Sequence, residues 1–142
     1  MTERSRGRRG DYARFVRLTT RWADNDAYGH VNNVAYYAFI DTAVNQILIE
    51  ADLLDVTGSE VSGVAAESGC RFHASAAYPD VIHAGVRIGR LGSSSIRYEV
   101  GLFRNDEDEA TAEGFFVHVM VRRATMRPAA IPAPLRAFLE AL

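Results

Sequence analysis

Apolar and polar residues alternate along this chain with two different periods, and the periods divide it into elements. Over residues 33–54 the apolar side chains recur at spacings of three and four without proline or glycine. This spacing predicts a helix of roughly six turns. Its apolar arc is wide, since it also takes in Val34, Tyr37 and Ala38. We therefore expect a central helix that the rest of the chain wraps on most sides.

A period of two, or a long apolar run between turn residues, predicts β-strands elsewhere. One strand precedes the helix and four follow it, at residues 15–22, 64–72, 81–91, 95–104 and 110–123. Loops rich in glycine, serine or acidic residues separate them, the longest at 55–63, and a short amphipathic helix at 135–142 ends the chain. The fold class is α+β: a curved antiparallel β-sheet around one long helix.

Composition supports one globular domain. The chain has 142 residues, of which 48% are hydrophobic, and no internal repeat. We expect a flexible basic tail at residues 1–12, which holds four arginines, and a single domain at 13–142. A formal charge of −2 and a pI near 6.1 argue against nucleic-acid binding. With no apolar run of ~18 residues and no secretory h-region after the basic start, we expect a cytoplasmic protein without a membrane span.

Candidate chemistry gathers just before the long helix. Asp24 and Asp26 are followed by Gly29 and then by Asn32 and Asn33 at the expected helix start. The first amide N–H groups of a helix lack intrahelical acceptors and favour negative charge. An ionised Asp26 beside them can attack a carbonyl or activate a water, and an amide at Asn32 or Asn33 can hold the oxyanion. Asp and Asn are also common helix caps, so spacing alone does not separate a catalytic from a structural role.

The run Asp24-Asn-Asp-Ala-Tyr-Gly-His-Val-Asn-Asn-Val-Ala-Tyr36 resembles the Asp-x-Asp-x-x-Gly-His-Val-Asn-Asn-x-x-Tyr motif of hotdog-fold acyl-CoA thioesterases of the 4-hydroxybenzoyl-CoA thioesterase type. The Leu91-Gly-Ser-Ser-Ser segment and the Arg127-Pro128 ending also resemble that family. The resemblance implies the hotdog fold, a long helix wrapped by a curved sheet. It covers most of the chain outside the basic tail.

By this resemblance Asp26 is the catalytic carboxylate and the backbone amide of Asn33 polarises the thioester carbonyl. His30 occupies the position of a histidine implicated in related acyl-carrier-protein thioesterases, so its two readings are a direct role and a hydrogen-bonding role in the turn. Tyr28 replaces the asparagine of the carrier-protein motif. Gly29 lets the chain bend around the acyl group, and both Tyr28 and Gly29 are expected to contact substrate.

Three further residues are candidates for substrate binding. Glu67 and Ser68 lie on the first strand after the helix, where either can position a water, and Arg90 is one of several arginines suited to the phosphates of coenzyme A. The alternative for each is an ordinary strand residue. The histidines outside the motif are spread over separate segments without metal-ligand spacing, so we expect no metal and no cofactor beyond the coenzyme A of the substrate.

The sequence thus predicts a thioester hydrolase that acts on acyl-CoA. Two alternatives stay open: a thioesterase for acyl carrier protein, and a non-catalytic hotdog module that binds acyl-CoA. A curved sheet with apolar strands leaves surface that one subunit does not cover. We expect a homodimer with sites at its interface, able to assemble further into a homotetramer.

Overall fold

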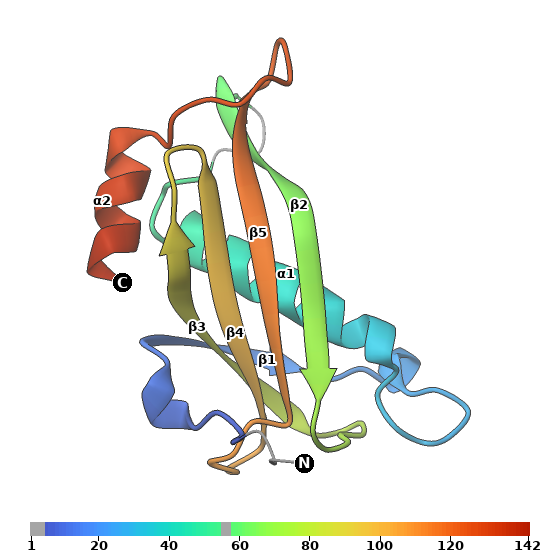
Figure 1. The fold of residues 1–142 in the computed structure, drawn as a ribbon. Coiled ribbons are helices and arrows are strands. Elements are labelled where there is room, and N and C mark those ends of the chain that lie inside the picture. The colour runs from blue at the N-terminus through green and yellow to red at the C-terminus, as the bar shows by residue number, and fades with distance from the viewer. Residues whose placement is uncertain (1–4, 55–57) are drawn as a thin grey trace.

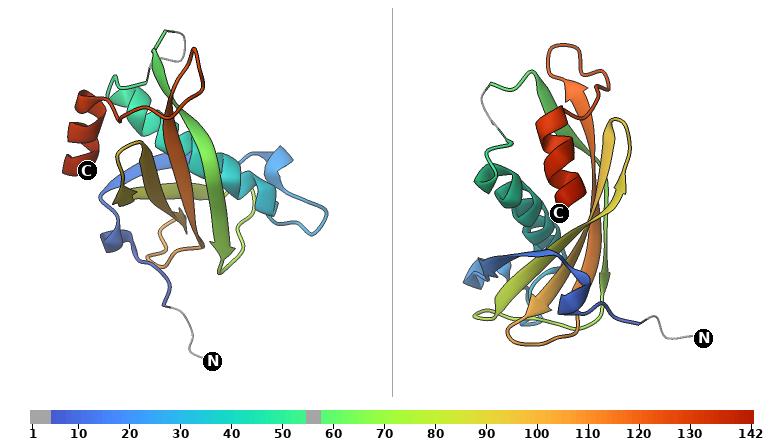
Figure 2. Two further views of the ribbon diagram at one scale, coloured as in Figure 1. Left: turned by 45° about the horizontal axis from the view of Figure 1, so that its top comes forward. Right: turned by 90° about the vertical axis from the view of Figure 1, so that its left-hand side faces the viewer.

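The computed structural model describes residues 5–54 and 58–142. Five strands form one antiparallel sheet, β1 (Arg14–Thr19), β2 (Val61–Phe72), β3 (Val81–Leu91), β4 (Ser95–Arg104) and β5 (Ala112–Arg122), in the order β1-β3-β4-β5-β2. The helices are α1 (Asn33–Glu50) and α2 (Ala133–Ala141), with short 3-10 turns at Arg9–Asp11 and Trp22–Asp24. The α+β class is confirmed, and α1 crosses one face of the curved sheet (Figures 1 and 2).

The core lies between α1 and this sheet face. The buried residues of α1 are Tyr36, Phe39, Ile40, Ala43, Val44, Ile47 and Leu48. They pack against alternating residues of the inner strands, such as Ile82, Val100 and Leu102. A Cβ at Gly114 would collide with the Ile40 side chain, so glycine there allows the helix to approach the sheet closely. In contrast, Val34 and Tyr37 are exposed in the single chain, which leaves one side of α1 uncovered.

Several element ends differ from the sequence prediction. The first strand ends at Thr19 rather than residue 22, because Trp22–Asp24 forms a 3-10 turn. Helix α1 ends at Glu50 rather than 54, because Asp52 takes a left-handed conformation with φ of 57°. Strand β2 begins at Val61 inside the expected loop. Residues 55–57 of that loop lie outside the described residues.

The N-terminal segment contacts the connection between β4 and β5. Arg6 donates through Nε and Nη2 to the Ala110 carbonyl at 3.0 and 2.7 Å, and Arg8 pairs with Asp108 at 3.0 Å. The Arg9 Nε–H group donates to the Glu107 carbonyl at 2.7 Å. Residues 1–4 of the expected tail lie outside the described residues. The division into tail and domain stays a prediction, although residues 5–12 contact the domain.

Neither helix in the described part of the chain combines the length and apolar character needed to cross a membrane.

Candidate active site

The residues before α1 form a closed turn. The Asp26 N–H donates to the His30 carbonyl at 2.8 Å, and the Gly29 N–H donates to the Asp26 carbonyl at 3.1 Å. Gly29 has φ of +80°, a conformation that residues with a Cβ rarely adopt. Glycine is therefore favoured at this position, where the turn brings the His30 carbonyl within hydrogen-bond distance of the Asp26 N–H.

The Asp26 carboxylate is half-buried and only partly engaged. Its Oδ1 accepts a hydrogen bond from the Tyr28 N–H at 2.9 Å, which fixes the side chain within the turn. Among the described residues, none donates a hydrogen bond to Oδ2. One oxygen is thus held by the turn, while the other can engage a water or a carbonyl carbon.

The first amide of helix α1 finds no acceptor in the described part of the chain. The Asn32 side chain caps the helix by accepting from the Val34 N–H at 2.9 Å, and the Ala35 N–H donates to the Asn32 carbonyl at 2.9 Å. The Asn33 N–H donates to no acceptor within residues 5–54 and 58–142. Because the helix dipole adds positive potential here, this amide is suited to a developing negative charge.

Backbone pairing joins the turn to the helix start. Asn25 and Val31 form an isolated antiparallel bridge, and the Asn32 N–H donates to the Asp24 carbonyl at 2.8 Å. The Asp26 turn is therefore folded back against the first residues of α1. Asp26 and Asn33 are seven residues apart in the sequence. The backbone bonds of Asn25 with Val31 and of Asn32 with Asp24 bring their two segments side by side.

Asp24 supports the turn. It is 5% exposed, and its carboxylate accepts from the Arg21 N–H at 2.7 Å and from the Arg21 Nη2 at 2.9 Å. The hydrogen bond from Arg21 to Asp24, together with the charge of Asp24, raises the pKa of the Arg21 guanidinium. Asp24 is thus occupied by Arg21, which leaves Asp26 as the acid of the motif with an available oxygen.

The connection from β2 to β3 supplies a wall that the sequence did not indicate. The Val31 N–H donates to the Ala76 carbonyl at 2.8 Å, and the Tyr78 N–H donates to the Asn25 Oδ1 at 3.1 Å. The Tyr78 ring meets the Trp22 ring edge-on at 6.1 Å. Irregular backbone of this kind has no periodic signal, so only the three-dimensional structure places residues 76–78 beside the turn.

Exposed apolar side chains surround the turn. Trp22 is 76% exposed, Tyr28 86% and Val34 68% in the single chain. Large apolar side chains gathered in this way mark a surface for a ligand or another chain.

The remaining predicted residues lie in different places. His30 is exposed, and in the described part of the chain its ring makes no hydrogen bond. Glu67 and Ser68 are exposed neighbours on β2, so their side chains point to opposite faces of the sheet. Arg90 lies near the end of β3, nine residues or roughly 30 Å of strand from Val81, which follows the wall segment. A single chain therefore does not bring Arg90 to the Asp26 turn.

The structure places a closed acidic turn at the start of a long helix, and a curved sheet wraps around that helix. Comparison of the sequence with protein families agrees with this arrangement. Residues 20–139 match the sequence model of the thioesterase-like superfamily. The chain belongs to this superfamily. No curated protein matches the chain in sequence.

Solved structures agree with this membership. The PA5185 protein from Pseudomonas aeruginosa PAO1 is similar, with 52% identity over 96% of each chain and a TM-score of 0.93. A 1,4-dihydroxy-2-naphthoyl-CoA thioesterase from Synechocystis shares the fold at 15% identity and a TM-score of 0.83, covering 90% of this chain and 96% of the other. The gentisyl-coenzyme A thioesterase BH1999 does so at 21% identity and a TM-score of 0.78, with coverages of 87% and 98%. The fold of the thioesterase-like superfamily thus extends over most of the chain.

Proposed function

We propose that this member of the thioesterase-like superfamily is an acyl-CoA thioesterase of the 4-hydroxybenzoyl-CoA thioesterase type, which hydrolyses an acyl-CoA to a free acid and coenzyme A. One observation carries the proposal: among the described residues, the Asp26 carboxylate keeps one oxygen unengaged and is folded against a helix start whose Asn33 N–H has no acceptor. Two solved structures with the same fold are described as acyl-CoA thioesterases, which supports the choice of substrate class.

The reaction needs an oxygen nucleophile and a donor for the carbonyl oxygen. The Asn33 N–H donates to that oxygen as it becomes negative, and loss of one such donor typically slows a reaction about 100- to 1000-fold. Asp26 acts in one of two ways. It attacks the carbonyl carbon, expels the coenzyme A thiolate and forms an anhydride that water then cleaves, or it takes a proton from the water that attacks directly.

Replacement of the carboxylate tests the role of Asp26. Asp26→Asn keeps the shape and the Oδ1 acceptor but removes the charge, so release of free thiol from a panel of aliphatic and aryl acyl-CoAs should fall at least about 100-fold. Asp41→Asn, at an exposed position on α1, is the matched control and should keep the original rate. Equal rates in Asp26→Asn and the unaltered protein would exclude a catalytic carboxylate at this position.

The proposed enzyme is a homodimer with its sites at the interface, able to pair further into a homotetramer. Strand β2 ends the sheet order, so its outer edge pairs with no other strand in residues 5–54 and 58–142, and residues 65–68 at its centre are exposed. The exposed Tyr28 and the uncovered side of α1 also favour a second subunit. In such a dimer Glu67 or Ser68 on the β2 edge can serve the partner's site.

The other site assignments belong to the same proposal. Gly29 and Tyr28 line the acyl group. His30 acts directly or through hydrogen bonds that its ring does not make with the described residues of the single chain. Arg90 binds coenzyme A phosphate at the site of a partner subunit, because within one chain it lies far from the Asp26 turn. A cytoplasmic location also stays a prediction.

A further inference from the structure

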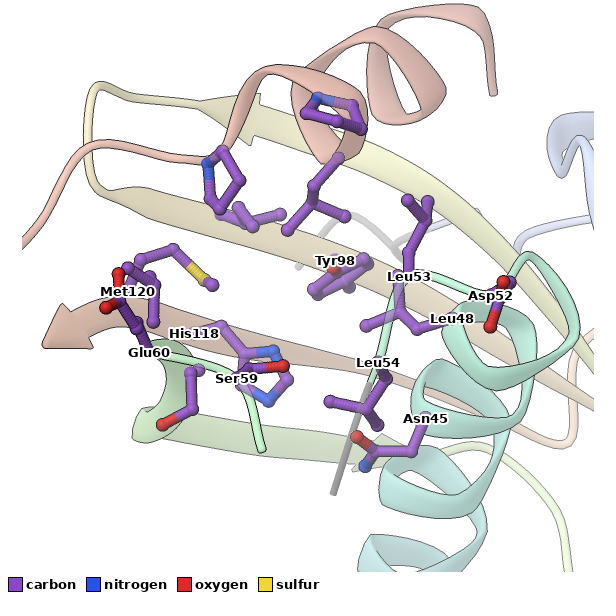
Figure 3. Close-up of a pocket in the computed structure, with 17 residues that line it drawn as sticks. Asn45, Leu48, Asp52, Leu53, Leu54, Ser59, Glu60, Tyr98, His118 and Met120 are labelled. Atoms are coloured by element: carbon purple, nitrogen blue, oxygen red, sulfur yellow. The ribbon is translucent and has the colours of Figure 1, made fainter. Parts of the chain in front are cut away.

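A cavity lies at the opposite end of α1 from the Asp26 turn. Its volume is about 480 Å³, and it is lined by the last turns of α1, the start of β2, the strands β4 and β5, and the start of α2 (Figure 3). From Asn33 to Leu48 the helix rises about 22 Å. Within one chain, the cavity is therefore a separate place from the turn that carries Asp26.

Two polar side chains on the sheet, Tyr98 and His118, line this cavity and make no hydrogen bond with the described residues. Tyr98 on β4 is 2% exposed, and its hydroxyl makes no hydrogen bond with the described residues. His118 on β5 is 7% exposed, and no hydrogen bond to its ring nitrogens is found over residues 5–54 and 58–142. The two rings meet edge-on at 5.7 Å, and Figure 3 shows them adjacent in the pocket.

An unsatisfied buried polar group is costly, and native proteins contain few of them. Among the described residues, the Tyr98 hydroxyl is the one fully buried side-chain polar atom without a partner, and the His118 ring, which also makes no hydrogen bond, lies beside it. A ligand or water that bonds to both groups explains this arrangement. Because the cavity is large enough for more than a water molecule, a ligand is the natural occupant.

The rest of the lining defines the chemistry of that ligand. Apolar side chains form most of the wall: Leu48, Leu53, Leu54, Ile96, Met120 and Leu135. The carboxylates of Asp52 and Glu60 lie toward the margins of the pocket in Figure 3, where they disfavour the entry of an anion. An apolar body with a neutral polar end matches this distribution.

The protonation states point the same way. Burial lowers the pKa of the His118 imidazole and outweighs the opposing effect of the Asp41 charge, and burial raises the pKa of the Tyr98 hydroxyl. Both groups are therefore uncharged at neutral pH. A neutral imidazole offers one donor and one acceptor, and a phenol hydroxyl does the same. A ligand hydroxyl is able to donate to one of them and accept from the other.

We propose that this cavity binds an apolar group that carries a hydroxyl, with the hydroxyl held between Tyr98 and His118. Two sources present this chemistry. One is a hydroxylated acyl group of the thioester substrate, entering from the site of a partner subunit, a source that rests on the proposed function. The other is a free hydroxylated small molecule, which does not depend on it.

Binding is tested with 4-methylphenol, toluene and 4-methylbenzoate on the full chain, with the methionine methyl groups labelled with ¹³C. The Met120 methyl lines the cavity, whereas Met126 is 60% exposed outside it and serves as the internal control. We expect 4-methylphenol to shift the Met120 signal saturably without shifting Met126. Toluene should bind about 3- to 10-fold more weakly, since it lacks the hydroxyl, and 4-methylbenzoate should bind more weakly still.

Conservative variants then assign the contact. Tyr98→Phe and His118→Phe should each weaken 4-methylphenol binding about 3- to 10-fold and leave toluene binding nearly unchanged. Tyr37→Phe removes an exposed hydroxyl outside the cavity and should have no effect. The proposal is overturned if 4-methylphenol leaves Met120 unshifted, if both cavity variants bind it as the unaltered protein does, or if the benzoate binds best.

Turnover distinguishes the two sources. A rise in the KM for an aryl acyl-CoA at constant kcat, when 4-methylphenol is added, assigns the cavity to the acyl group. Unchanged kinetics at saturating 4-methylphenol assign it to a free molecule. The binding measurements are repeated in Asp26→Asn, where the Met120 shift should persist. If Asp26 proves not to be catalytic, the binding measurements still decide whether the cavity binds the ligand.

Discussion

At the scale of single residues, His118 couples folding to pH. Burial holds the pKa of its ring below the ordinary value of about 6.5. As pH falls through about 6.5 the unfolded chain therefore takes up a proton before the folded one, and the free energy of unfolding decreases. The stabilising contribution is fully present above this pH and is lost progressively below it.

His118→Gln should consequently flatten the loss of stability between pH 7.5 and pH 5, measured by urea unfolding at each pH. The pKa of His83 is also lowered, by partial burial and then by Arg9 and Arg17, so His83→Gln is the comparison that separates the two histidines. If the free energy of unfolding of His118→Gln still falls with decreasing pH as steeply as that of the unaltered protein, the buried imidazole does not cause the pH dependence.

The two acids of the motif show how far residue types predict a site. Their position before the helix start makes Asp26 a candidate together with an amide at Asn32 or Asn33, and only the family resemblance singles out Asn33. The structure adds the pairing of Asp24 with Arg21. Tyr98 and His118 escape prediction because twenty residues separate them in sequence. Only the register of β4 against β5, which places Tyr98 opposite Phe116, brings their rings together.

At the scale of elements, the end of α1 is set by backbone geometry that the apolar spacing does not report. The Leu53 N–H donates to the Leu48 carbonyl at 2.9 Å and the Asp52 N–H donates to the Ile49 carbonyl at 3.0 Å, the two bonds of a Schellman motif. Apolar residues continue past this point at Leu53 and Leu54, so the period alone extends the helix too far. The N-terminal end is better predicted, because Asn32 is a strong capping residue.

Asp52 occupies the left-handed position of this motif with φ of 57°, where glycine is the preferred residue. Asp52→Gly should raise the free energy of unfolding by roughly 0.5–1 kcal/mol, since it relieves the backbone strain. Asp52→Ala keeps the Cβ and should give no gain. Denaturant unfolding of both variants measures the change in the free energy of unfolding. Equal changes in Asp52→Gly and Asp52→Ala would show that the left-handed conformation of residue 52 does not reduce stability.

At the scale of the whole molecule, the order of the strands places β1 and β2 at the two edges of the sheet. Successive strands β3, β4 and β5 pair as neighbours, as local pattern suggests, but β2 pairs with β5 rather than with β3. That choice depends on how the sheet closes around α1, which no local spacing encodes. It places the twelve-residue strand β2 at the edge, with its exposed centre available to a second chain.

Light scattering at micromolar concentration should accordingly give the mass of a dimer or a tetramer. Ala65→Lys puts a charge on the exposed part of the β2 edge, and two such strands paired together would bring like charges close, so the variant should shift toward monomer. Ser93→Lys, in the exposed turn before β4, is the control and should keep the original mass. A monomer in the unaltered protein would contradict an interface at β2.

The contacts of the N-terminal arginines affect how readily a protease cleaves this end of the chain. An enzyme that cuts after arginine must draw the chain into its own site, and Arg6, Arg8 and Arg9 are already bonded to the β4–β5 connection. The Arg8 side chain is 61% exposed in its ion pair with Asp108, so salt screens that attachment more than it affects the bonds of Arg6 to a carbonyl. A protease that cuts after arginine should therefore cleave after Arg8 faster at high ionic strength than at low ionic strength.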